Sequence, residues 1–186
     1  MNVILLAAIS VNGKIAEREG QTSLDWTSKE DLRFFVDKTK EVGVLIMGRK
    51  TFDTIGKPLK GRRIIVMTRA SVVGRDVSGP TDWSPLFPPT SQHNDGTVEF
   101  TGEQPRELLA RLQNEGCDGV VIAGGSSVYS QFLREGLVTE LYLTIEPVLF
   151  GEGVSLASGF DRINLSLVDI QRLGEGSVLL HFLCPR

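Results

Sequence analysis

A glycine-rich, basic segment from Gly48 to Arg63 separates two short apolar runs, Val42 to Met47 and Ile64 to Met67. Uninterrupted apolar runs of this length are typical of strands buried on both faces. The segment begins with a glycine, a base and a threonine, so the first strand is expected to end in a turn and a short helix. Amides at a helix N-terminus lack partners and favour anions, so the segment predicts a phosphate site. The segment ends with a further basic pair, Arg62-Arg63, which could hold a second anion.

Similar apolar runs recur along the chain and alternate with helical patterns, which predicts an α/β class. The expected strands are 3–9, 42–47, 64–67, 98–100, 120–123, 141–149, 165–173 and 177–183. Helices are expected after Thr27 or Ser28, from Pro105, and after the glycines at 124 and 125. The last two strands flank Gly174-Glu175-Gly176, as in a hairpin. We expect a mostly parallel sheet with an antiparallel C-terminal edge, in one domain over residues 1–186.

Charge and composition restrict the partners. The net charge is −3, and the basic residues cluster around residues 49 to 69, which favours a small anionic ligand over a nucleic acid. The run from Val3 to Ile9 is too short for a membrane span or signal peptide, so a cytoplasmic protein is expected. Cys117 and Cys184 show no metal-ligand spacing, and no metal is expected. Residues 70–97, rich in glycine, proline and serine, predict a long loop.

A second glycine turn, Gly124-Gly125-Ser126-Ser127, follows the apolar run at 120–123. Paired glycines let a ligand approach the backbone closely, and the helix behind them offers free amides. Taken alone, such a turn is more often simple chain geometry. Two such turns at strand ends are better explained by one ligand that carries several phosphates, because open α/β sheets bind ligands at the carboxyl ends of their strands.

Asp31 is the acid with the clearest potential for chemistry. It shares a helix face with Phe35 and could lie at the wall of an apolar cleft. A carboxyl group placed there has a raised pKa and can exchange protons or pair with an amidine-like group. The alternative is that Asp31 only completes the first helical turn, which is the commoner role for an acid at this position.

Several separated motifs in the right order resemble the dihydrofolate reductase family over nearly the whole chain. They are Ala7-Ala8, the stretch from Leu24 to Phe35 with Trp26 and Asp31, the Gly48 to Arg63 segment, Ala123 to Tyr129, and Leu141 to Thr144. The resemblance implies a three-layer fold with helices on both faces of the sheet. It also implies hydride transfer from NADPH to dihydrofolate, within tetrahydrofolate biosynthesis and one-carbon metabolism.

The resemblance assigns roles on the substrate side. Asp31 would pair with the pterin ring and support protonation of its N5, with Thr144 bonded to that carboxylate and Trp26 holding a water. Tyr129 would lie at the edge of the nicotinamide. Arg62 would bind the α-carboxylate of the glutamate tail. The implied substrate-binding residues are Leu6, Ala7, Asp31, Leu32, Phe35, Ile55, Leu59, Arg62 and Thr144.

On the cofactor side, the resemblance implies that the two glycine turns hold the phosphates of NADPH. Arg69 would bind the 2′-phosphate, which favours NADPH over NADH. The implied cofactor-binding residues are Ala8, Ile15, Gly48, Arg49, Lys50, Thr51, Thr68, Arg69, Ala123, Gly124, Gly125, Ser126, Ser127, Val128 and Tyr129.

Two segments depart from the family pattern. Val11 to Ala16 and Leu143 to Gly153 look more like the riboflavin-pathway pyrimidine reductases. The leading hypothesis is a dihydrofolate reductase that acts as a monomer or homodimer on a small-molecule substrate. A reductase of 2,5-diamino-6-ribosylamino-pyrimidinone 5′-phosphate is the alternative on the same fold with the same cofactor. A non-catalytic NADPH-binding module is a third hypothesis, which would have no need for a buried Asp31.

Overall fold

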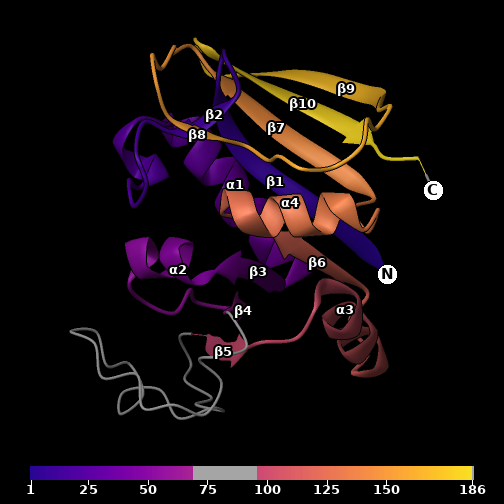
Figure 1. Cartoon of the computed structure of the whole chain (residues 1–186). Coiled ribbons are helices and arrows are strands. Elements are labelled where there is room, and N and C mark those ends of the chain that lie inside the picture. Colours follow the sequence, from indigo (N-terminus) through magenta and orange to yellow (C-terminus); the bar gives the residue numbers. More distant parts are fainter. Residues whose placement is uncertain (69–95, 186) are drawn as a thin grey trace.

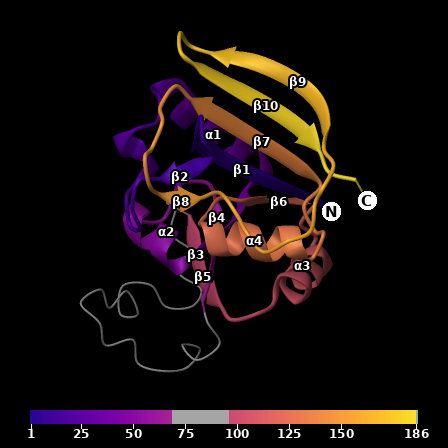
Figure 2. The ribbon, with the colours of Figure 1, turned by 45° about the horizontal axis from the view of Figure 1, so that its top comes forward.

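The computed structural model describes residues 1–68 and 96–185, and its centre is one eight-stranded sheet. In spatial order the strands are β5 (Thr97–Thr101), β4 (Arg63–Met67), β3 (Val44–Gly48), β6 (Gly119–Ile122), β1 (Asn2–Ser10), β7 (Glu140–Glu146), β10 (Ser177–Leu183) and β9 (Ser166–Leu173). Neighbours from β5 to β7 are parallel, and β10 and β9 are antiparallel. Figures 1 and 2 show the β9–β10 hairpin at one edge. The expected mostly parallel sheet with an antiparallel C-terminal hairpin is confirmed.

Helices cover both faces of this sheet, as expected. They are α1 (Lys29–Val42) and α2 (Arg49–Ile55) on one face, and α3 (Pro105–Asn114) and α4 (Ser126–Arg134) on the other. The parallel strands are buried between these two layers. On β3, Leu45 and Met47 pack with Phe52 of α2, whereas Ile46 packs with α3 and α4. This alternation explains why the strands read as unbroken apolar runs.

Two boundaries differ from the expected ones by more than one residue for a clear physical reason. Val42 ends α1 and does not begin a strand, because Gly43 adopts a left-handed conformation (φ 82°) and closes the helix before β3. Strand β7 ends at Glu146, three residues before the expected Leu149. Pro147 follows directly and has no amide with which to continue the ladder.

A second, two-stranded sheet was not expected from the sequence. It joins β2 (Lys14–Ala16) to β8 (Val154–Ser155), and a 3₁₀ turn (Ser23–Asp25) follows β2. The sequence predicts only a polar loop for residues 14 to 25. Strands of two or three residues leave too few side chains to show the alternation of a strand.

Part of the sequence lies outside the described residues. This applies to Arg69 and to most of the loop expected at 70–97. Among the described helices, none combines the length and apolarity that a bilayer crossing requires.

Phe132 of α4 is fully buried in the core between α3, α4 and the sheet. We expect Phe132→Ala to lower the free energy of unfolding by about 3–5 kcal/mol, since the truncation leaves a cavity in a packed layer. Urea unfolding followed by circular dichroism would measure this. Leu149→Ala, at a side chain that is 70% exposed, is the control and should change little. A loss for Phe132→Ala no larger than that of the control would contradict the packing described.

Candidate active site

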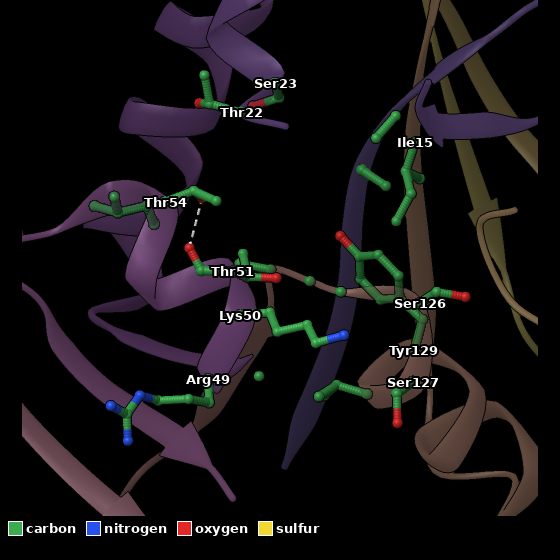
Figure 3. Close-up of a pocket in the computed structure, with 18 of the residues that line it drawn as sticks. Ile15, Thr22, Ser23, Arg49, Lys50, Thr51, Thr54, Ser126, Ser127 and Tyr129 are labelled. Atoms are coloured by element: carbon green, nitrogen blue, oxygen red, sulfur yellow. Dashed lines mark hydrogen bonds between the residues drawn. The ribbon is translucent and has the colours of Figure 1, made fainter. Parts of the chain in front are cut away.

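A cavity of about 1230 Å³ opens at the carboxyl ends of β3, β4 and β6, between α1 and α2 on one side and the start of α4 on the other. Figure 3 shows Lys50, Thr51 and Thr54 of α2 on one wall, opposite Ser126, Ser127 and Tyr129 of α4. Most of the residues predicted from the sequence line this cavity. They are Leu6, Ala7, Ala8, Ile15, Asp31, Leu32, Phe35, Gly48, Arg49, Lys50, Thr51, Ile55, Leu59, Arg62, Thr68 and 123–129.

The two glycine turns lie against each other at this end of the sheet. The amide of Gly48 donates to the carbonyl of Gly124 (2.8 Å). A Cβ atom on Gly124 would lie 3.1 Å from the Thr51 methyl group, and one on Gly125 would lie 3.0 Å from the Thr51 hydroxyl. Gly124 also has φ +122°, a conformation that side-chain-bearing residues rarely adopt. Glycine is therefore required for this close approach.

The first turn of α4 has the features of an anion site. Gly125 is its N-cap, and a glycine has no side chain with which to accept the first amides. Free amides at a helix N-terminus beside a glycine turn suit a pyrophosphate. The cavity is also long enough to reach from these turns to Asp31 and Arg62. The residues present therefore fit a dinucleotide such as NADPH, with Gly124, Gly125, Ser126 and Ser127 near its phosphates.

The two bases of α2 are already paired. Arg49 Nε lies 3.0 Å from an Asp53 oxygen, and its guanidinium lies over the Phe100 ring. Lys50 Nζ lies 2.5 Å from a Glu19 oxygen, although both of these side chains are largely exposed. In Figure 3 the Arg49 side chain points away from Ser126 and Ser127, whereas Lys50 points toward them. Lys50 is thus better placed than Arg49 to meet a phosphate at the α4 turn.

Asp31 lies at the cavity wall and is only 8% exposed. Ser28 caps α1, and its hydroxyl accepts the Asp31 amide (3.2 Å), so the helix start is fixed. Burial raises the pKa of the Asp31 carboxyl group, and the charge of Glu146 raises it further, while the hydroxyls of Thr144 and Thr27 act in the opposite direction. Asp31 therefore holds a proton more readily than an ordinary aspartate does.

Trp26 and Thr144 do not line the cavity, unlike the other predicted residues that the structure describes. Thr144 is close enough to Asp31 to lower the pKa of its carboxyl group, but its hydroxyl makes no hydrogen bond of good geometry within the described chain. Trp26 packs edge-on against Phe150 with a ring separation of 5.1 Å. Its indole nitrogen is buried, and no partner for it lies among the described residues. The Trp26 indole N–H could donate a hydrogen bond to a water, and the Thr144 hydroxyl could donate to or accept from one.

Arg62 is a buried cation in the lining of the same cavity. It is 8% exposed and donates to the Thr39 hydroxyl (3.0 Å) and the Lys60 carbonyl (3.3 Å). Burial lowers the pKa of its guanidinium. Within residues 1–68 and 96–185, no carboxylate forms an ion pair with it. A buried arginine without an acidic partner is a suitable site for an anionic group of a ligand.

Apolar side chains occupy the wall between Asp31 and Arg62. They are Leu6, Ala7, Leu32, Phe35, Ile55 and Leu59. The Tyr129 hydroxyl donates to the Leu6 carbonyl (2.8 Å), and burial together with the Asp31 charge raises the pKa of this phenol. Tyr129 therefore uses its proton to hold β1 against α4. The apolar lining, together with the Asp31 carboxyl group and the Arg62 guanidinium, suits a flat ring that bears polar groups.

The sequence did not predict the cavity residues of the loop 18–24 or of Gly102 to Gln104. These segments are polar and have no periodicity. Only the path of the chain brings them back over the strand ends, so no local signal identified them.

A family model described as the RibD C-terminal domain matches residues 1–179. Among curated relatives, the uncharacterized protein YwjB of Bacillus subtilis is 27% identical over 96% of this chain and 95% of its own length. A 2,5-diamino-6-ribosylamino-4(3H)-pyrimidinone 5′-phosphate reductase of Methanothermobacter thermautotrophicus is 24% identical over 95% of both chains. The crystal structure of a pyrimidine reductase-like protein from Corynebacterium diphtheriae has a TM-score of 0.77 and 16% identity, and covers 100% of this chain and 92% of its own.

These findings correct the leading hypothesis. The expected reduction of dihydrofolate is wrong, and so are the place in one-carbon metabolism and dihydrofolate as the ligand. The matching family and the relative from Methanothermobacter point instead to a riboflavin-pathway pyrimidine reductase. The motifs behind the resemblance belong to the shared fold and the glycine turns, so they did not distinguish the substrates. The expected oxidoreductase class and the NADPH cofactor agree with the family. On the match over residues 1–179, the chain belongs to the RibD C-terminal domain family.

Proposed function

We propose that the protein reduces a 2,5-diamino-6-ribosylamino-pyrimidinone 5′-phosphate with NADPH. The observation that carries this proposal is that one cavity is lined by the glycine turn at the start of α4, a buried acid and a buried arginine. The relative from Methanothermobacter, which bears this activity in its name, supports the choice of substrate.

The substrate chemistry matches Asp31 and Arg62. The 2-amino group and N3–H of the pyrimidinone form an edge with two parallel donors, which suits the two oxygens of an ionised Asp31. Such a bidentate pair is both strong and directional. The 5′-phosphate supplies the anion that Arg62 lacks among the described residues. The apolar wall between them would hold the flat ring.

The proposed reaction is a hydride transfer. NADPH would supply a hydride to C1′ of the ribosyl group, the carbon at the aldehyde oxidation level, once the sugar opens to an imine, and the imine nitrogen would take a proton from solvent. Asp31 and the apolar wall hold the ring, and Arg62 holds the phosphate, so that C1′ between them faces the cofactor. Fixing both ends of the substrate is the main contribution of the chain, because geometry alone lowers such barriers substantially.

The direct test follows NADPH absorbance with the pyrimidinone phosphate and, separately, with dihydrofolate. We expect loss of absorbance only with the pyrimidinone phosphate. NADPH that binds without being oxidised by this substrate would contradict the proposal and favour the non-catalytic binding module.

Arg62→Leu is expected to raise the KM for the phosphorylated substrate by about 10- to 100-fold, the usual effect of removing a hydrogen bond between charged groups. The matched comparison uses the dephosphorylated substrate, for which wild type and variant should differ little. Circular dichroism must show that the variant keeps its fold, since Arg62 also bonds Thr39. If the variant raised the KM of both substrates equally, the 5′-phosphate would not bind at Arg62.

A further inference from the structure

Glu146, the last residue of β7, is a buried acid outside the cavity lining. It is 3% exposed. One carboxylate oxygen accepts the backbone amide and the hydroxyl of Ser28 (2.8 Å each), and the other accepts the Ser177 hydroxyl (2.5 Å). No Lys, Arg or His of the described chain forms an ion pair with it. A buried charge held only by neutral donors is costly for stability, which indicates another use.

These contacts connect β7 to the helix that carries Asp31. Ser28 is the N-cap of α1, and its hydroxyl both donates to Glu146 (2.8 Å) and accepts the Asp31 amide (3.2 Å). Ser177 ties the other side of the same carboxylate to β10. The start of α1 is therefore fixed from the sheet and not only by its own capping residue.

We propose that Glu146 is a positioning residue that fixes the Asp31 carboxyl group at the cavity wall through Ser28. The inference deepens the proposed function, in which Asp31 binds the pyrimidinone edge. A shift of about 1 Å in such a group can cost on the order of 100-fold in rate, which gives the link a catalytic value.

Glu146 also acts on Asp31 through its charge. Its negative charge is one of the causes that raise the pKa of the Asp31 carboxyl group, after burial. The other groups around Asp31 are the Thr144 hydroxyl from β7, the Thr27 hydroxyl before α1, and Tyr129 of α4, whose pKa Asp31 raises in turn. Removing the charge of Glu146 should therefore lower the pKa of Asp31, whereas loss of a merely structural contact should not.

Two variants separate these effects. Glu146→Gln removes the charge but keeps an acceptor for Ser28, so the pKa of Asp31 should fall while turnover on the pH plateau falls less than in Glu146→Asp. Glu146→Asp keeps the charge but withdraws the acceptor from Ser28. Its turnover should fall by about 10- to 100-fold at unchanged NADPH affinity. Glu140→Gln is the matched control, since Glu140 lies on the same strand and bonds Asn2, Tyr142 and His181, away from Asp31.

Two measurements decide the inference. Turnover of Glu146→Asp tests the positioning, because a folded variant with full turnover excludes it. The titration of the ¹³C-labelled Asp31 carboxyl group by NMR, in the protein without substrate, tests the effect of the charge. A lower pKa in Glu146→Gln but not in Glu140→Gln supports the inference, and equal titration in all three proteins overturns it. Wild-type protein that fails to oxidise NADPH with the pyrimidinone phosphate would overturn the proposed function, whereas the titration, which needs no substrate, still shows whether Glu146 acts on Asp31.

Discussion

Asp31→Asn is expected to lower kcat/KM for the pyrimidinone phosphate by about 100-fold or more, the value of two hydrogen bonds to a charged group. An asparagine side chain offers one oxygen and one N–H₂ group to an edge that has two donors. One donor of the substrate would then face a donor of the enzyme inside a buried site. NADPH affinity should be unchanged, because the proposal assigns the Asp31 carboxyl group to the substrate ring and not to the cofactor.

The same assignment predicts the acid side of the pH profile. Only the ionised carboxylate can accept from both substrate donors. We therefore expect kcat/KM to have its full value above the pKa of Asp31 and to fall as the pH drops through that pKa. Because burial and the Glu146 charge raise this pKa, the fall should begin at a higher pH than for an ordinary aspartate. Asp31→Asn should lose this limb of the profile, whatever activity remains.

Asp37→Asn provides the control for both measurements, since Asp37 lies on the same helix and is exposed. It should keep the wild-type rate and profile. If Asp31→Asn retained wild-type kcat/KM at neutral pH, the carboxylate would have no part in binding the substrate.

The fold could be predicted because its signals are local and repeated. Runs such as Val120 to Ala123 indicate strands buried on both faces, and Ser28 marks the start of α1. The strand order follows from contacts between distant segments, which no local pattern contains. The cavity follows from the class of fold, since parallel strands with helices on both faces place their carboxyl ends together.

The proposed substrate was harder to predict because Asp31 and Arg62 suit either ligand. A pterin and this pyrimidinone share the amino-oxo ring edge that a carboxylate binds, and a glutamate tail and a phosphate are both anions. Chemistry at these two positions therefore could not decide between the two reductases.

The distinguishing information was in two segments far apart in the sequence. Val11 to Ala16 and Leu143 to Gly153 both resembled pyrimidine reductases, and the structure brings them together. The Val11 amide donates to the Val148 carbonyl (2.9 Å), and the Asn12 side-chain amide donates to the Phe150 carbonyl (2.7 Å). Directly after the second segment, β8 pairs with β2. Ile15, Ala16 and Val154 from this region line the cavity. Two weak local signals were thus parts of one unit at the cavity, which only the tertiary structure reveals.

Gly124→Ala should weaken NADPH binding by about 10- to 100-fold, which corresponds to losing one or two charge-assisted hydrogen bonds at the turn. The added Cβ would lie 3.1 Å from the Thr51 methyl group and would also force a side chain into φ +122°. The turn must then move away from α2, and the free amides of α4 move with it. Isothermal titration calorimetry with NADPH would measure the loss.

Gly136→Ala separates the contact with Thr51 from the cost of positive φ. Gly136 follows the other end of α4 with φ +63°, and a Cβ there would meet nothing within 4 Å. Both variants should lose some stability, by about 1–3 kcal/mol for a strained backbone, but only Gly124→Ala should lose cofactor affinity. Equal NADPH affinity in the two variants would mean that the close approach of the glycine turns serves chain packing alone. The dinucleotide would then have to bind at another part of the cavity.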